Sequence, residues 1–93
     1  MSDAITRHLA IRGRVQGVGY RNYIEHKAGE LGVSGWVRNR LDGSVEAAVH
    51  GSPAAVGAII ECAQRGPRAA QVTAVEVSEA AGSYRTFTVM PTE

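Results

Sequence analysis

Residues 6–32 read TRHLAIRGRVQGVGYRNYIEHKAGELG, and this stretch predicts a strand, a glycine-rich loop and a helix in that order. Leu9 and Ile11 alternate with polar or small neighbours, as in a strand with one buried face. Three glycines follow within residues 13–19, a density that interrupts regular structure. After the loop, apolar residues recur at helical spacing, and Gly32 is well placed to end the helix. The stretch therefore predicts a loop that leads from a strand directly into a helix N-terminus.

The rest of the chain predicts three more strands, a second helix and a short edge strand. The expected elements are strand 34–41, strand 44–50, helix 53–65, strand 71–79 and a short edge strand 85–89. Asp42-Gly43 is typical of a type I′ hairpin turn between the first two of these strands. Ser52 is a favourable N-cap for the second helix. On strand 71–79 we expect Val75 and Val77 to point inward.

The predicted order of elements is β-α-β-β-α-β within a single domain that spans residues 1–93. Right-handed crossovers place both helices on one face of an antiparallel sheet. The expected fold is therefore an α+β, ferredoxin-like sandwich. Many unrelated functions share this fold, so the fold alone does not decide the activity.

Composition excludes several classes of protein. Of the 93 residues, 44% are hydrophobic and 20% are charged, and the net charge of +1 is too balanced for a disordered tail or a simple polyanion binder. The charge is unevenly distributed, however. Residues 7–40 hold seven basic against two acidic side chains, whereas residues 41–93 hold three basic against six acidic. The basic half favours an anionic ligand, although a mixed surface with a chance bias would look the same.

The sequence contains one cysteine, Cys62, so an intramolecular disulfide is impossible. No apolar run approaches the roughly 20 residues of a membrane span. The first ten residues, MSDAITRHLA, lack the apolar core of a signal peptide. We therefore expect a soluble, cytoplasmic, monomeric protein without a membrane partner.

The glycine-rich loop can present an anion-binding site. In such a loop successive backbone N–H groups converge, and the helix N-terminus adds further donors. Arg21 lies in the first helical turn, where its guanidinium can bind two phosphate oxygens at once. The loop matches neither the Walker A pattern nor the dinucleotide-binding fingerprint. Taken by itself, it is equally compatible with a tight connection between a strand and a helix.

Two motifs carry a family resemblance. GRVQGVGYR at residues 13–21 and GWVRNRLDGSVE at residues 35–46 closely resemble the two signatures of the acylphosphatase family, and the likeness extends over roughly residues 9–77. It implies a ferredoxin-like fold and the hydrolysis of acyl phosphates to a carboxylate and inorganic phosphate. It also implies that Arg21 and Asn39 are the catalytic residues. Arg40 departs from the pattern, since many members have a small hydroxyl residue there.

The chemistry implied by this resemblance suits the residues present. A carboxylate leaving group is a stable anion and needs no general acid, so catalysis rests on positioning and electrostatics. Asn39 would accept a hydrogen bond from water and orient it. The expected phosphate-binding residues are Gln16, Gly17, Val18, Gly19, Tyr20 and Arg21. No His, Cys, Asp or Glu cluster has ligand spacing, so neither a metal nor another cofactor is expected.

Other functions compete with this one. A non-catalytic module that binds an anion such as carbamoyl phosphate would share both motifs. An RNA-binding domain of this fold needs aromatic residues on its central strands, and strands 9–12 and 45–50 have none, so no nucleic-acid partner is expected. Cys62 and Arg68 have the spacing of a cysteine phosphatase, but Cys62 falls near the end of a helix, where the helix dipole disfavours a thiolate. Tyr20 and Trp36 are expected to pack in the core.

Overall fold

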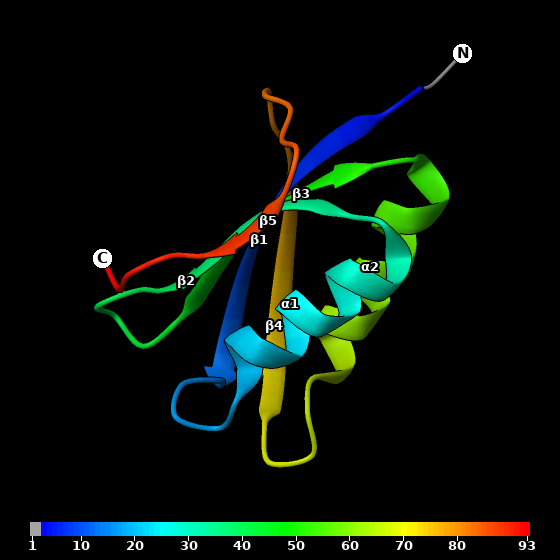
Figure 1. Cartoon of the computed structure of the whole chain (residues 1–93). Coiled ribbons are helices and arrows are strands. Elements are labelled where there is room, and N and C mark those ends of the chain that lie inside the picture. Colours follow the sequence, from blue (N-terminus) through cyan, green and yellow to red (C-terminus); the bar gives the residue numbers. More distant parts are fainter. Residues whose placement is uncertain (1–2) are drawn as a thin grey trace.

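The computed structural model describes residues 3–93, and its elements follow the predicted order (Figure 1). They are β1 (Ile5–Arg14), α1 (Tyr20–Leu31), β2 (Ser34–Asn39), β3 (Val45–Gly51), α2 (Pro53–Arg65), β4 (Gln71–Glu79) and β5 (Phe87–Val89). The strand order in the sheet is β4-β1-β3-β2-β5. Both helices cover the same face of this sheet. The ferredoxin-like fold is confirmed, with the difference that the sheet is mixed because β5 pairs parallel with β2.

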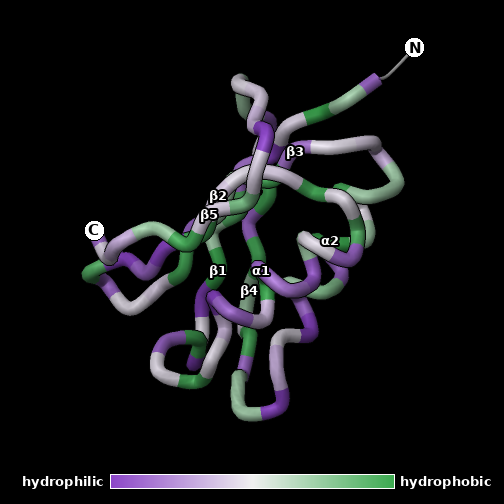
Figure 2. The backbone as a smooth tube through the Cα atoms, in the orientation of Figure 1, coloured by the Kyte–Doolittle hydropathy of each residue, from purple (hydrophilic) through white to green (hydrophobic). Residues whose placement is uncertain are grey.

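The core lies between the sheet and the two helices. Along the backbone, apolar and polar residues alternate, as the green and purple segments in Figure 2 show. The fully buried side chains include Leu9, Ile11, Ile24, Val37, Val45, Val49, Val56 and Ile59. Their burial removes apolar surface from water and supplies the main driving force for folding.

Val75 and Val77 both point to the predicted face of the sheet, but only Val75 is covered there. Val75 is half-buried against the core, as expected, but Val77 is 44% exposed. Val77 pairs with Leu9 and so shares the face of the sheet that the helices cover. Since β4 is an edge strand, the helices do not extend far enough to bury its final residues.

The β2–β3 hairpin also differs from its prediction. A type I′ turn requires positive φ at two consecutive residues, and here only Gly43 has it, at φ +94°. Gly43 N–H donates to the Arg40 carbonyl at 3.1 Å, and Arg40 N–H donates to the Ser44 carbonyl at 2.8 Å. The hairpin therefore has a three-residue loop, residues 41–43, in which a turn is followed by Gly43 in the left-handed region. Only the final loop position needs glycine.

Two tyrosine hydroxyls tie the first turns of α1 to the last turn of α2. The Tyr20 hydroxyl donates to the Ala63 carbonyl at 2.7 Å, and the Tyr23 hydroxyl donates to the Cys62 carbonyl at 3.0 Å. Tyr20 is buried, as expected, and this burial raises the pKa of its phenol well above the ordinary value, so the hydroxyl remains a donor. Pro67 has no N–H to give the Ala63 carbonyl its helical partner. The Tyr20 hydroxyl supplies the missing donor.

The other face of the sheet carries a charged network instead of helices. The Glu46 carboxylate accepts hydrogen bonds from His8 Nε2 at 2.6 Å, Arg38 Nε at 2.8 Å and Arg40 Nη1 at 3.1 Å. Arg38 also pairs with Glu93 at 3.2 Å. Arg38 and Arg40 are therefore both bound to carboxylates.

Trp36 lies on this open face, which corrects the expectation that it packs in the core. Its ring meets His8 edge-on with the centroids 6.5 Å apart, and the Arg38 guanidinium carbon lies 5.0 Å from its centroid. Trp36 is half-buried beside the charged network. The aromatic ring shields these ion pairs partly from water and stacks with the Arg38 cation.

Replacing Tyr20 with phenylalanine should lower the free energy of unfolding by about 1–3 kcal/mol, because the buried Ala63 carbonyl loses its donor. Tyr23→Phe is the matched control. The Cys62 carbonyl keeps the Gly66 N–H at 2.8 Å, so this variant should cost less than about 1 kcal/mol. Urea denaturation of both variants measures the difference. Equal losses would show that capping of the Ala63 carbonyl is unimportant.

The Glu46 network should make stability depend on acid pH. Burial opposes the charge of the Glu46 carboxylate, but the hydrogen bonds from His8 and Arg38 outweigh it, and the pKa lies below its ordinary value of 4.5. A lowered pKa in the folded state adds stability above pH 4.5 that is lost as the carboxylate protonates at lower pH. We expect Glu46→Gln to cost about 1–3 kcal/mol at pH 7 and progressively less below pH 4.5.

The control for Glu46 is Glu76→Gln, because Glu76 makes only an exposed ion pair with Arg12 at 3.5 Å. Its removal should change stability by less than about 1 kcal/mol. The measurement is urea denaturation between pH 3 and pH 7. A Glu46→Gln deficit that stays constant over this range would contradict the assigned role of the carboxylate.

Candidate active site

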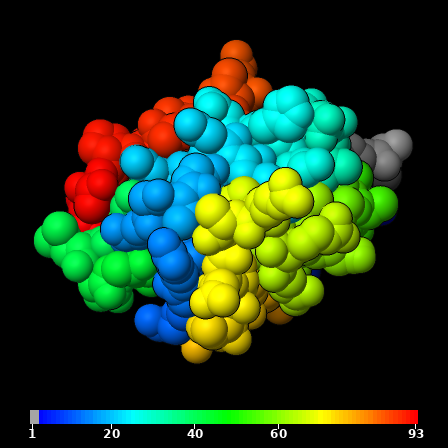
Figure 3. All heavy atoms as spheres, turned by 90° about the horizontal axis from the view of Figure 1, so that it is seen from below, coloured from blue at the N-terminus to red at the C-terminus, as the bar shows by residue number. Residues whose placement is uncertain are grey.

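Sheet topology brings two distant segments to the same end of the molecule. β1 and β2 both pair antiparallel with β3, so they run in the same direction and end at the same edge. The glycine-rich loop follows β1, and Asn39 is the last residue of β2. In Figure 3 the blue residues of this loop lie against the green β2–β3 hairpin. Arg21 and Asn39 therefore line the same pocket, although they are 18 positions apart in the sequence.

The start of α1 presents free backbone donors to this site. Gly19 is the N-cap residue and adopts φ +80°, a left-handed conformation that glycine tolerates without steric cost. No side chain of the described residues caps the helix, and its first turn has no acidic residue. Tyr23 N–H makes the first helical bond, to the Gly19 carbonyl. The N–H groups of residues 20–22 and the helix dipole thus favour an anion.

A pocket of about 240 Å³ opens at this helix N-terminus. Its lining residues are Val15, Gly17, Gly19, Tyr20, Arg21, Asn22 and Asn39. Arg21 is half-buried in this lining. Within residues 3–93 it makes no ion pair, in contrast to Arg38 and Arg40. A guanidinium that no carboxylate neutralises gives the pocket a positive charge.

Asn39 contributes an acceptor to the same pocket. Its Oδ1 is buried and has no hydrogen-bond donor among the described residues. A buried amide oxygen without a donor is costly, so it readily accepts a bond from the O–H of water or of a ligand. The pocket therefore combines donors and positive charge on the α1 side with one acceptor on the β2 side.

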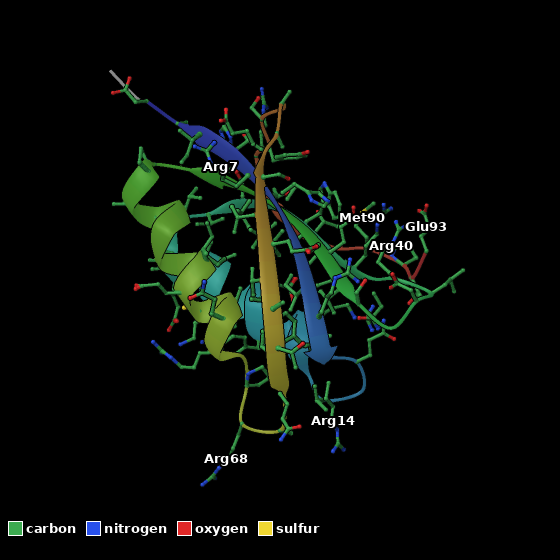
Figure 4. All side chains as sticks on the ribbon, turned by 180° about the vertical axis from the view of Figure 1, so that it is seen from behind. Arg7, Arg14, Arg40, Arg68, Met90 and Glu93 are labelled. Carbon is green, nitrogen blue, oxygen red and sulfur yellow. The ribbon has the colours of Figure 1, made fainter. Side chains whose placement is uncertain are left out.

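The C-terminal segment fixes the backbone around Asn39. Glu93 N–H donates to the Asn39 carbonyl at 3.0 Å, and Leu41 N–H donates to the Glu93 carbonyl at 3.2 Å. Figure 4 shows Arg40, Met90 and Glu93 close together at this end of the molecule. Asn39 is thus held between β3 on one side and the end of the chain on the other.

The structure divides the predicted phosphate-binding residues into two groups. Gly17, Gly19, Tyr20 and Arg21 line the pocket. Gln16 and Val18 do not: the Gln16 amide donates to backbone carbonyls of the β2–β3 hairpin, and Val18 packs against the core.

Val15 and Asn22 line the pocket but were not predicted from the sequence. Asn22 directly follows Arg21, and its position in the first helical turn is the signal that points to it. Val15 is fully buried and forms an apolar part of the lining, which the sequence pattern of the loop does not distinguish from core.

Other candidate chemistry stays apart from this pocket. Cys62 is half-buried in the last turn of α2, and Arg68 points into solvent in Figure 4, so the two form no common site. Within residues 3–93, no three His, Cys, Asp or Glu side chains are placed to hold a metal ion. Neither helix of the described chain has the length and apolar character to cross a membrane.

Comparison with known proteins gives a consistent result. The sequence model of the acylphosphatase family matches residues 7–89. An acylphosphatase of Thiobacillus denitrificans is 52% identical over 82 residues, which are 88% of this chain and 92% of that protein. An acylphosphatase of Synechococcus is 50% identical over 93 residues, and this match covers 99% of this chain and 99% of that protein. The structure of an acylphosphatase from Coxiella burnetii superposes with a TM-score of 0.90 at 33% identity and covers 94% of this chain and 93% of its own. With this match in sequence, length and fold, the chain belongs to the acylphosphatase family.

Proposed function

We propose that this chain hydrolyses acyl phosphates to a carboxylate and inorganic phosphate in the pocket at the start of α1. Membership of the acylphosphatase family supports the activity. One observation carries the assignment to this pocket. The pocket is lined by Arg21, by the N-terminus of α1 and by Asn39, and within residues 3–93 no side chain caps that helix and no donor reaches Asn39 Oδ1.

The phosphoryl group binds on the α1 side of the pocket in this proposal. The backbone N–H groups of Gly17, Gly19 and Tyr20, which line the pocket, and the Arg21 guanidinium donate hydrogen bonds to its oxygens. Arginine suits this role because its planar fork can bind two oxygens and stays charged at any relevant pH. The same donors stabilise the charge that the phosphoryl oxygens carry in the transition state.

The attacking water binds on the β2 side. Asn39 Oδ1 accepts one of its hydrogen bonds and aims the oxygen lone pair at phosphorus, in line with the bond to the acyl oxygen. The P–O bond to the acyl group breaks, and its electron pair leaves with the carboxylate. The proton lost by the water goes to a phosphoryl oxygen, so that neither a general acid nor a strong base is required.

We further propose a location, an oligomeric state and a domain organisation for this chain. A cytoplasmic location fits a chain whose single cysteine cannot form an internal disulfide. We also propose that the chain acts as a monomer, because the pocket is lined by residues of one copy. Residues 1–93 are proposed to form one domain, since the five strands share one sheet.

Arg21→Ala and Asn39→Ala should each reduce kcat on benzoyl phosphate by about 10²–10³-fold, the usual cost of losing one transition-state contact. The two should differ in binding. Arg21→Ala should also weaken competitive inhibition by inorganic phosphate, whereas Asn39→Ala should leave it nearly unchanged, since Asn39 contacts water. Steady-state kinetics with phosphate as inhibitor separates these effects.

Arg14→Ala is the matched control for Arg21, because Arg14 ends β1 and points into solvent in Figure 4. It should keep kcat within about twofold. Wild-type turnover in a folded Arg21 or Asn39 variant would refute the assignment of this pocket. Phosphate binding without any turnover by the wild-type chain would indicate an anion-binding module instead.

Hydrolysis of benzoyl phosphate should continue unchanged after dialysis against EDTA. The carboxylate leaving group needs no Lewis acid, and Arg21 with the helix N-terminus supplies the positive charge. The measurement is the initial rate of phosphate release before and after chelation, with Mg²⁺ added back. A rate that falls with EDTA and recovers with Mg²⁺ would overturn this metal-independent mechanism.

A further inference from the structure

We infer that the Gln16 side chain is a positioning residue, which fastens the glycine-rich loop to the β2–β3 hairpin and thereby sets the distance between the bound phosphoryl group and Asn39. This inference rests on the proposed function, because Gln16 acts through Asn39. It assigns the side chain a role different from phosphate binding. The Gln16 side chain is absent from the pocket lining, so it does not contact the substrate site.

The geometry is a two-point attachment. Gln16 Nε2 lies 2.7 Å from the carbonyl oxygen of Arg40 and 2.8 Å from the carbonyl oxygen of Ser44. Both distances are short for N–H···O bonds between neutral groups. Arg40 directly follows Asn39, and Ser44 directly precedes β3. The amide of Gln16 therefore holds both ends of the three-residue loop of the hairpin.

The orientation of the Gln16 amide follows from its partners. Both partners are carbonyl oxygens, which only accept, so the amide must present its NH₂ group to them. The group has two hydrogens, and each serves one carbonyl. Gln16 is half-buried at this position. Because both hydrogens are used, rotation of the side chain would break two bonds at once, which makes the attachment rigid.

The hairpin itself does not need Gln16 to close. The Arg40 carbonyl also accepts from Gly43 N–H, and the Ser44 carbonyl also accepts from Arg40 N–H. Removal of the Gln16 amide therefore leaves neither carbonyl without a donor. What is lost is the link between the hairpin and the loop. The expected consequence is a shift of Asn39 relative to the phosphoryl group in a chain that still folds.

The cost of such a shift is catalytic. In-line attack requires the water oxygen to approach phosphorus along one direction, and a misplacement of about 1 Å can reduce a rate by about 10²-fold. Phosphate binding depends on Arg21 and the loop N–H groups. Loss of the two Gln16 hydrogen bonds removes none of these donors, and they remain together in one segment. We therefore expect kcat to fall and the affinity for phosphate to persist when the Gln16 bonds are lost.

The test uses Gln16→Met, which removes both donors at similar volume, and Gln16→Asn, which keeps the amide but shortens its reach by one methylene. Both should lower kcat on benzoyl phosphate by about 10–100-fold. The inhibition constant of inorganic phosphate should change by less than about threefold. Gln64→Met, on an exposed position of α2, is the matched control and should keep wild-type kinetics.

A double-mutant cycle with Asn39→Ala decides how Gln16 acts. If Gln16 positions Asn39, Gln16→Met should reduce kcat less than twofold further once Asn39 is alanine. Full multiplication of the two losses would overturn the inference, and so would wild-type kcat in either Gln16 variant. Wild-type kcat in Asn39→Ala would defeat the proposed function and this inference together. Loss in Asn39→Ala without loss in Gln16→Met would defeat the inference alone.

Discussion

The hydrogen bond from the Tyr20 hydroxyl to the Ala63 carbonyl fixes where α1 begins, and the candidate site depends on that position. Tyr20 is the first residue of α1 and is anchored in the core, while its neighbours Gly19 and Arg21 line the pocket. A helix N-terminus that frayed would lose the common direction of its N–H groups. By anchoring the first turn to α2, the protein keeps these donors rigid without using a side-chain cap, which would occupy the place of the anion.

A second constraint is the direction of the strands. β1 and β2 are parallel to each other because β3 lies between them and is antiparallel to both. The segments that follow β1 and β2 must then meet at one end of the sheet. The order of elements read from the sequence already contains this result, because a β-α-β crossover connects strands that run in the same direction. The encounter of the glycine-rich loop with Asn39 was therefore predictable without coordinates.

Details that depend on side chains far apart in sequence were not predictable in this way. The Asp42-Gly43 pair favoured a two-residue turn, but the hairpin closes between Arg40 and Ser44 around a longer loop. Local propensity identifies a residue that tolerates positive φ, not the register in which the turn forms. Gln16 was predicted only as part of a phosphate cradle, because nothing in its own segment indicates that its amide reaches the hairpin. Alternation placed Val77 on the correct face of the sheet but could not show that an edge strand leaves it exposed.

Arg40 shows how the site accommodates a departure from the family pattern. Side chains alternate along β2 and its extension, so Asn39 and Arg40 project to opposite faces. Asn39 contributes its amide to the pocket, whereas the Arg40 side chain joins Glu46 on the open face. The part of Arg40 that contacts the glycine-rich loop is its carbonyl, which any residue would supply to Gln16. Attachment through backbone atoms thus frees position 40 to carry a charged side chain that stabilises the far side of the sheet, without altering the pocket.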